Sequence, residues 1–587
     1  MSGKGPSRPR SGVRMPPPSS ENWPASWLWG PDAPAVTGAR GMVATTDRLA
    51  TDVGVEVLRA GGNAVDAAVA ASFALAVVNP EAGNVGGGGF MLVRTREGAV
   101  HALDHRSTAP AGATGGMFSD GEGGRSERAE LGHLAVAVPG SVAGLWEAHG
   151  RFGVRPWPGL VEPAVGLARG FTVTDRYVRS LRPHIVDGLR RFPESEAAFL
   201  PGGRVPEAGD VLRQGDLART LERIRDRGTD GFYRGETAAL IVEEMERGGG
   251  LLTLDDLAGY AAVWRPPVRF GYRGHTVVSV PPPSSGGLTM AEAAHILEAV
   301  GPSGRGGTPW HGPGHVHRLV EAWRRAFADR NHYLADPDFV ALPSETLASR
   351  AYGRFRASTV AADRATPSSA VGPGVEAFRG EGRTDPTGAS PEGRRTTHLS
   401  VVDARGMAVA ATTTLNTWYG SKLVVPGTGV LLNNEMDDFT ATPGVPNHFG
   451  LVQGEANAIE PGKRPLSAMT PTLVLDPRGE LFLVVGTPGG GTIITTTMQV
   501  ISNMLDHGMG LSAAVRAPRV HHQHLPDRID VEPGGLPAEV VAQLEELGHT
   551  VRERDEPSGD VQAVLVGDDG RLEGVSDPRR GGVAAGP

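Results

Sequence analysis

The chain has no cysteine among its 587 residues, so disulfides, thiolate metal sites and a cysteine nucleophile are all excluded. Lysine is also scarce, because it stands only at positions 4, 422 and 463, and arginine carries nearly all of the positive charge. We interpret this bias as genome composition rather than as a site built for anions. The formal net charge of −9 provides no basic surface, so we do not expect a nucleic-acid partner.

Long hydrophobic runs are missing as well. The longest, Ala64 to Val78, spans about 15 residues and contains Asp66, and it is too short to cross a bilayer. We interpret it as a buried helix and expect no membrane span. The first residues are rich in Pro, Ser and Arg and have no apolar stretch of signal-peptide length. We therefore predict a disordered tail over residues 1–37 and leave the cellular compartment open.

Glycine and proline are abundant, with 83 and 47 residues, and they predict many turns. Hydrophobic periodicity predicts helices over 47–60, from 63 onward, over much of 157–246, and over 253–260, 316–333 and 492–505. Residues 281–300 indicate a rigid turn that leads into a helix. Alternating patterns predict a strand at 90–95 and hairpins at 396–416, 472–486 and 561–577. Hairpins flanked by helices indicate an α+β protein with stacked sheets and helices outside.

The character of the chain changes abruptly at residue 396. Residues 371–395 are rich in Gly, Pro and charge, and we predict an exposed, mobile linker there. If the bond between Arg395 and Thr396 were cut, Thr396 would carry its hydroxyl beside its own α-amine. That amine, with an unperturbed pKa of about 8, can accept the hydroxyl proton and so activate a nucleophile. On spacing alone, however, Thr-Thr at the head of a strand more often reflects β propensity.

Several segments, taken in order, resemble the γ-glutamyltranspeptidase family. Those of the C-terminal half are TTHLSVVD (396–403), LNNEMDDF (432–439), KRPLSAMTPT (463–472) and GTPGGGTIITT (486–496). Those of the N-terminal half are GGNAVDAAVA (61–70), NPEAGNVGGGGFML (79–92), LDHRSTAP (103–110), VPGSVAG (138–144) and PPPSSGG (281–287). The resemblance covers residues 38–580, and such collinear motifs are far more specific than any single one.

The resemblance implies the fold of an N-terminal-nucleophile hydrolase, a four-layer αββα sandwich that cuts itself into two interlocked subunits. Thr396 matches the nucleophile, which is freed when its own hydroxyl attacks the carbonyl of Arg395. Cleavage would leave a large subunit ending at 395 and a small catalytic subunit of residues 396–587. Thr414 matches a second threonine that hydrogen-bonds the nucleophile. Gly489 and Gly490 match the oxyanion-hole glycines, since glycine lets backbone N–H groups approach a developing negative charge.

The implied substrates are glutathione and other γ-glutamyl compounds, whose head group is a zwitterion. Arg106 matches the family's clamp for the α-carboxylate, because a guanidinium binds a carboxylate bidentately, and Ser467 adds a hydroxyl donor. The residues that match the ammonium side are Asn416, Glu435 and Asp438.

One position departs from the family. It usually has two serines where this chain has Ser467 and Ala468. The missing donor costs about 1–3 kcal/mol of substrate binding unless a water replaces it, and it leaves the identity of the acyl group open.

The implied reaction is acyl transfer from Thr396 to water or to an amino-acid or short-peptide acceptor, with no metal or organic cofactor. Two histidine-rich segments, 315–317 and 520–527, lack a zinc spacing such as H-E-x-x-H, and we interpret them as surface or packing residues. The glycine-rich segments at 84–89 and 486–491 lack the remaining residues of dinucleotide-binding or P-loop motifs.

Two other functions stay open. One is a β-lactam acylase on the same scaffold, acting on a glutaryl-type side chain. Such a substrate has no α-ammonium, so a buried Asp438 would face no cation, which is unfavourable. The other is an uncleaved relative that only binds ligands, and the intact Thr396, Thr414 and glycine pair argue against it.

Overall fold

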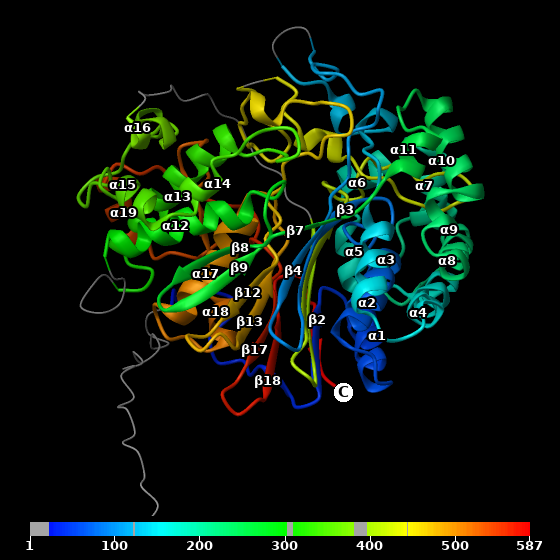
Figure 1. The fold of residues 1–587 in the computed structure, drawn as a ribbon, viewed down its shortest axis with the longest axis horizontal. Coiled ribbons are helices and arrows are strands. Elements are labelled where there is room, and N and C mark those ends of the chain that lie inside the picture. Colours follow the sequence, from blue (N-terminus) through cyan, green and yellow to red (C-terminus); the bar gives the residue numbers. More distant parts are fainter. Residues whose placement is uncertain (1–22, 121–123, 302–308, 381–395, 443) are drawn as a thin grey trace, which may run out of the picture.

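The computed structural model describes residues 23–120, 124–301, 309–380, 396–442 and 444–587. At its centre lie two seven-stranded sheets, and helices cover both sides of the pair (Figure 1). Neighbouring strands in both sheets are antiparallel throughout. The chain is therefore an α+β protein, as the sequence predicts.

The first sheet contains two of the predicted hairpins. Its strands, in spatial order, are β1 (Val36–Gly38), β18 (Leu572–Ser576), β17 (Gln562–Val566), β13 (Leu481–Gly486), β12 (Thr472–Leu475), β9 (His275–Ser279) and β8 (Val268–Tyr272). The pairs β12–β13 and β17–β18 confirm the hairpins predicted at 472–486 and 561–577.

The second sheet contains the strand that follows Thr396. Its spatial order is β19 (Val583–Ala585), β2 (Gly41–Thr45), β10 (Thr397–Asp403), β11 (Ala408–Thr414), β3 (Gly88–Arg94), β4 (Val100–His105) and β7 (Val263–Arg265). The pair β10–β11 confirms the third hairpin. Because β10 lies between β2 and β11, its backbone is hydrogen-bonded on both sides, and it forms a rigid base for the residue that precedes it.

Three apolar cores hold these layers together. One lies between the two sheets, where Phe90, Val402 and Leu473 meet. A second packs helices onto the outer face of the β10 sheet, and a third packs other helices onto the outer face of the β12 sheet. The sandwich therefore buries both faces of each sheet. Apolar strand residues accordingly point to the inner face as well as to the outer face.

The helices divide between the two outer faces (Figure 1). Those beside the β10 sheet are α1 (Arg48–Arg59), α2 (Ala64–Val78), α3 (Ser141–Phe152), α4 (Trp157–Arg169), α5 (Asp175–Ser180), α6 (Pro183–Leu189), α7 (Pro193–Phe199), α8 (Gly215–Arg227), α9 (Asp230–Tyr233), α10 (Gly235–Gly248) and α11 (Leu254–Gly259). Those on the other side are α12 (Gly286–Ala299), α13 (Pro313–Tyr333), α14 (Ser344–Leu347), α15 (Arg350–Ala357), α16 (Val375–Arg379), α17 (Thr492–Leu505), α18 (Leu511–Arg516) and α19 (Ala538–Glu546). All of the helices predicted from periodicity are present.

Helix α2 shows why the apolar run at 64–78 is helical and buried. The Asn63 side chain accepts hydrogen bonds from the backbone N–H groups of Val65 and Asp66, while Asp66 accepts one from the N–H of Asn63. This capping box satisfies the free N–H groups at the start of the helix. Every residue of α2 is buried, since it lies between the β10 sheet and helices α1 and α4.

The prediction of a disordered tail over 1–37 is wrong for residues 23–37; residues 1–22 lie outside the described part. Trp23 and Trp27 are buried in the core beside the β12 sheet, and the Trp27 indole N–H donates to the carbonyl oxygen of Arg516 at 2.9 Å. Val36–Gly38 extends the first sheet as β1, paired with β18. The sequence contained no sign of these partners because they lie more than 480 residues away in the chain.

The prediction of an exposed, mobile linker over 371–395 is wrong for residues 371–377, which are buried or half-buried. Val371 and Val375 are buried, and α16 (Val375–Arg379) is a short helix. The N–H of Gly374 donates to Asp329 on α13 at 2.7 Å. Residues 381–395, including Arg395, lie outside the described residues. Among the described residues, no helix has the length and apolar character needed to cross a membrane.

Candidate active site

Thr396 lies directly before β10 and is only 6% exposed. The backbone N–H of Gly489 donates a hydrogen bond to its hydroxyl oxygen, Oγ1, at 3.2 Å. The two residues come from different sheets, since Gly489 follows β13 of the first sheet. Contact between the two sheets thus brings the hydroxyl and the glycine turn together.

The glycine turn has a backbone that other residues rarely adopt. Gly489 and Gly490 have φ angles of 146° and 57°, both in the region that favours glycine. A Cβ at Gly489 would lie 2.4 Å from Thr492 Oγ1. Helix α17 begins at Thr492, so the turn also stands at a helix N-terminus, where the dipole stabilises negative charge. The Gly489 N–H thus lies close to a helix N-terminus and within hydrogen-bonding distance of the Thr396 hydroxyl.

A buried cation and two carboxylates lie beside this turn. Arg106 follows β4 and forms ion pairs with Glu435 at 2.8 Å and with Asp438, both from the 3₁₀ turn Glu435–Asp438. Arg106 Nε also donates to the carbonyl oxygen of Pro465 at 3.3 Å. The two sequence-predicted subsites, for carboxylate and for ammonium, therefore touch one another directly.

Burial shifts the pKa of each member of this cluster. Desolvation raises the pKa of Glu435 to about 6, although the neighbouring Arg106 charge opposes the rise. Burial likewise raises the pKa of Asp438, again against Arg106. Burial lowers the pKa of Arg106 itself, but Glu435 and Asp438 more than reverse this effect. Charged partners thus keep the guanidinium ionised inside the protein.

Asn416 and Thr414 complete the side of the site formed by the end of β11. The Asn416 side-chain amide donates to the carbonyl oxygen of Asn434 at 3.0 Å and to Asp437 at 3.4 Å. Thr414 Oγ1 accepts the backbone N–H of Asn416 at 2.9 Å. Asn416 has a φ of 77°, a conformation that asparagine tolerates better than most residues.

The segment with Ser467 and Ala468 is held by the proline-rich turn that precedes α12. The N–H of Ser467 donates to Pro283 O at 2.8 Å, and the N–H of Ser285 donates to Ser467 O at 2.7 Å. Ser467 Oγ accepts the N–H of Met469 at 3.0 Å, which leaves its own proton for donation. The PPPSSGG segment therefore acts as a support for the pocket wall.

Most of the residues predicted from sequence line one pocket. They are Arg106, Thr396, Thr414, Asn416, Asp438, Ser467, Ala468 and Gly490. Gly489 and Glu435 do not line it but contact lining residues, Thr396 and Arg106. The structure does not describe Arg395, the other residue of the predicted cleavage site.

Sequence reasoning missed Arg330, which also lines this pocket. Arg330 lies near the end of α13, is 1% exposed, and comes from a helix predicted only as amphipathic. A buried arginine on a helix with several arginines has no spacing that distinguishes it, and only the packing reveals it.

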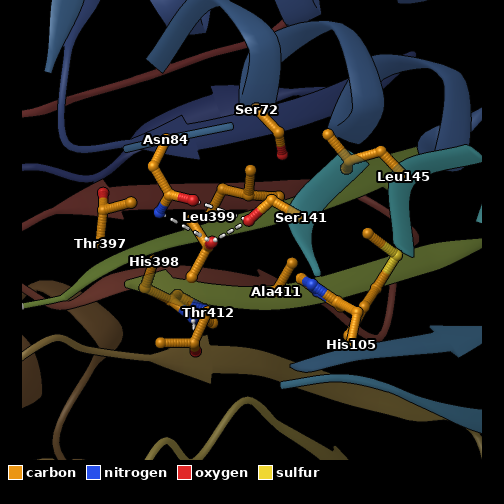
Figure 2. Close-up of a pocket in the computed structure, with 12 residues that line it drawn as sticks. Ser72, Asn84, His105, Ser141, Leu145, Thr397, His398, Leu399, Ala411 and Thr412 are labelled. Carbon is orange, nitrogen blue, oxygen red and sulfur yellow. Dashed lines mark hydrogen bonds between the residues drawn. The ribbon is translucent and has the colours of Figure 1, made fainter. Parts of the chain in front are cut away.

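A second cavity lies on the other side of β10, between the sheet and the helices (Figure 2). Thr397 lines it, since successive strand residues face opposite sides. Asn84 and Ser141 are hydrogen-bonded there at 2.7 Å, and burial lowers the pKa of His105 to about 3. The two cavities share no lining residue, so this one is separate from the pocket of Thr396.

Histidines and a carboxylate also gather at His317, Glu321 and His549, where ligand atoms lie within 4.8 Å of one another. His317 Nδ1 and His549 Nε2 are 2.8 Å apart. Glu321, however, accepts hydrogen bonds from Arg324 and Arg325 at 3.2 and 2.6 Å. Two guanidinium groups on the only carboxylate of this trio oppose a metal cation there. The three histidines of segment 520–527, His521, His522 and His524, are buried and pack inside the protein.

Its fold and pocket place the chain in the class of α+β enzymes that transfer or hydrolyse acyl groups. The family model described as gamma-glutamyltranspeptidase matches residues 50–587. A glutathione hydrolase proenzyme of Escherichia coli (strain K12) is 45% identical over 93% of this chain and 91% of its own length. The chain belongs to the γ-glutamyltranspeptidase family.

Acylases are similar to this chain too. An acylase ACY 1 proenzyme of Pseudomonas sp. (strain V22) is 36% identical over 92% of each chain. The crystal structure of a cephalosporin acylase from Bacillus halodurans superimposes with a TM-score of 0.81 at 28% identity, covering 96% of this chain and 99% of the other. Proteins named as glutathione hydrolases and proteins named as acylases are thus both similar to this chain.

Proposed function

We propose that this protein is a self-processing γ-glutamyltransferase and glutathione hydrolase with Thr396 as its nucleophile. The single observation that supports this most directly is the pocket itself. Thr396, Arg106 and Asp438 line one pocket, and the Gly489 N–H and the Glu435 carboxylate contact these lining residues from behind. The arrangement of helices, sheet, sheet and helices supports the finer assignment to the αββα N-terminal-nucleophile type.

In the first step, Thr396 Oγ1 attacks the carbonyl carbon of residue 395, and the peptide C–N bond breaks. The amine of Thr396 takes up the proton, and an ester joins residue 395 to the hydroxyl. Water then hydrolyses the ester, which leaves a large subunit ending at 395 and a small subunit of residues 396–587. Anchoring of residues 371–380 on α13 limits the part of the linker that separates after cleavage to residues beyond 380.

In the second step, the mature Thr396 attacks the γ-carbonyl of glutathione or a related compound. The α-amine of Thr396 accepts the hydroxyl proton and passes it to the departing amine. The N–H groups of Gly489 and Gly490 stabilise the tetrahedral oxyanion, and one such donor contributes about 3 kcal/mol. Water or an amino-acid or short-peptide acceptor then takes the γ-glutamyl group from the ester.

The ion pair between Arg106 and Asp438 explains the preference for a zwitterion. The α-carboxylate and α-ammonium of a γ-glutamyl group stand on the same carbon, so their partners must also lie side by side. Arg106 and Asp438 are in direct contact at the pocket wall, with Glu435 behind them. Arg106 and Ser467 take the carboxylate, while Asp438, Glu435 and Asn416 take the ammonium.

A β-lactam acylase activity is the second candidate, because Ala468 removes one hydroxyl donor and acylases share the fold. A glutaryl group has no ammonium and would leave the buried Asp438 without its substrate partner. The ratio of rates on γ-glutamyl-p-nitroanilide and a glutaryl amide distinguishes the two, and we expect the γ-glutamyl compound to be the better substrate.

Self-cleavage is tested on a denaturing gel. We expect two bands from the 61.3 kDa chain of the wild type and one full-length band from the Thr396→Ala variant, which lacks the attacking hydroxyl. N-terminal sequencing of the small fragment should begin at Thr396. An active wild-type enzyme that stays in one piece would contradict the proposal.

A further inference from the structure

Arg330 is the second guanidinium of the substrate pocket. It lines the cavity together with Thr396, Ser467 and Ala468, yet it comes from α13, a helix that the family motifs quoted above do not include. Its side chain donates from Nε to Ser285 Oγ at 3.0 Å and from Nη1 to Asn331 Oδ1 at 2.8 Å. Both acceptors are neutral.

The two pocket arginines differ in their partners. Arg106 has two carboxylates in contact, Glu435 and Asp438. Among the described residues, no carboxylate lies within 4.0 Å of Arg330, although other buried arginines of α13 have one, such as Arg325 with Glu321 at 2.6 Å. A buried cation without a contacting anion is unfavourable, and such a charge persists where a ligand supplies the anion.

The electrostatics of the pocket agree with this geometry. Burial lowers the pKa of Arg330 to about 10, and the charge of Asp438 only partly opposes the shift. The guanidinium remains protonated at neutral pH, so the pocket wall carries an unneutralised positive charge.

The number of charges also favours a second cation. Arg106 alone would have to serve Glu435, Asp438 and a substrate carboxylate, three anions for one guanidinium. With Arg330 and the substrate ammonium included, three cations face three anions. Each carboxylate can then have a cationic partner of its own.

Arg330 is connected to Ser467, the neighbour of the position where this chain departs from its family. Ser285 Oγ accepts from Arg330 Nε and donates to Ser467 O at 2.7 Å. The guanidinium is thus fixed against the Ser467–Ala468 wall, in which Ala468 provides no hydroxyl. We propose that Arg330 binds the α-carboxylate of the γ-glutamyl substrate as a second cation beside Arg106. This inference rests on the proposed γ-glutamyl function.

The test uses two substrates that differ only in the α-carboxylate, γ-glutamyl-p-nitroanilide and 4-aminobutyryl-p-nitroanilide. We expect Arg330→Gln to lower kcat/KM for the first about 10- to 100-fold, mainly through KM, because a hydrogen bond between two charged groups is lost. The loss on the second substrate should be at least tenfold smaller. A matched control is Arg324→Gln, since Arg324 is buried on the same helix but does not line the pocket. It should leave the ratio of the two kcat/KM values unchanged.

Equal losses on both substrates, or an unchanged KM for the γ-glutamyl compound, would overturn the inference and leave Arg330 a structural residue. If Arg330→Gln does not fold, Arg330→Lys is the test, because lysine keeps the positive charge but lacks the planar guanidinium that binds a carboxylate through two N–H groups. This variant should raise KM for γ-glutamyl-p-nitroanilide and not for 4-aminobutyryl-p-nitroanilide. An equal rise in both KM values would contradict the inference. A wild type that is inactive on γ-glutamyl-p-nitroanilide would instead refute the proposed function itself.

Discussion

Glu435 and Asp438 surround one guanidinium, that of Arg106, in a part of the protein from which water is almost excluded. In this setting each carboxylate holds its proton more tightly than in water, as the raised pKa of both groups shows. Binding of an ammonium group requires the ionised form. The affinity for an amino-acid head group should therefore depend on pH in a range where most carboxylates do not titrate.

We predict that the inhibition constant of L-glutamate rises as the pH falls from 7 to 5. Glu435, with a pKa of about 6, becomes protonated over this range and ceases to attract the ammonium. Below the pKa of Glu435, the inhibition constant should increase up to tenfold for each unit by which the pH falls. The measurement is competitive inhibition of γ-glutamyl-p-nitroanilide turnover at several pH values.

Glu435→Gln should abolish most of this pH dependence, because the amide has no charge to lose. Asp437→Asn is the matched control, since Asp437 also has a pKa raised to about 6 by burial but pairs with Arg125 outside the pocket. The control should keep the pH dependence. The same pH profile in Glu435→Gln as in the wild type would show that another group is responsible.

At this scale, the motifs predict the pocket residues well, because those residues recur at fixed places in short segments. Thr396, Asp438 and Ser467 come from three such segments, and they line one pocket. Arg330 shows the limit of this reasoning. Its burial depends on which face of α13 meets Ser285 and the pocket wall, and no local pattern contains that information.

Single elements form where local sequence and burial agree. Helix α2 combines an apolar composition all round with a capping box at Asn63 and Asp66. The Asn63 side chain also donates to Phe152 O at 2.7 Å, so the cap joins two helices. The start of α2 is thus fixed by both local and long-range hydrogen bonds.

We predict that Asn63→Ala destabilises the protein by about 1–2 kcal/mol, since loss of an N-cap leaves helix N–H groups without a partner. Thermal unfolding of the purified enzyme should show a lower apparent Tm. Thr253 forms a capping box with Asp256 at the start of the short, exposed helix α11, and Thr253→Ala should lower the Tm less. Equal effects of the two changes would mean that burial of the cap adds nothing.

The hairpins were predictable because each has two alternating segments joined by a short turn, which needs only neighbouring residues. Their places in the sheets were not. Strand β10 pairs with β2, more than 350 residues earlier in the chain, as well as with its hairpin partner β11. Pairing over that separation depends on the packing of both sheets and not on the sequence near Thr396.

On the scale of the whole molecule, the N-terminal segment 23–38 joins regions that the chain separates widely. Trp27 packs among residues of the β12 side, and the guanidinium of Arg579 lies 5.2 Å from its ring centroid. Trp23 and Trp310 rings lie 5.3 Å apart. If the chain is cut before Thr396, the contacts of Trp27 with Arg516 and Arg579 join the large subunit to the small one.

We predict that Trp27→Ala lowers the stability of the enzyme by about 3 kcal/mol, a typical value for truncation of a buried aromatic side chain. The apparent Tm of the processed enzyme is the measurement, with size-exclusion chromatography to show whether the subunits stay together. Leu28→Ala is the matched control. Leu28 is the next residue in the chain and its side chain is 76% exposed, so this substitution should change the Tm little. A Tm unaffected by Trp27→Ala would mean that segment 23–38 contributes nothing to the fold.

The sequence by itself determined the family, the helices and hairpins, and the chemical groups of the pocket, because all of these are written in short segments of neighbouring residues. Only the tertiary structure decided which partners the pocket side chains contact. It placed the Gly489 N–H on the Thr396 hydroxyl and closed Arg106 against Glu435 and Asp438. Within the described part of the chain it left Arg330 without a contacting carboxylate, and it buried Trp23 and Trp27 in a core. Such contacts depend on burial between layers that lie hundreds of residues apart, and burial is what sets their charges and pKa values.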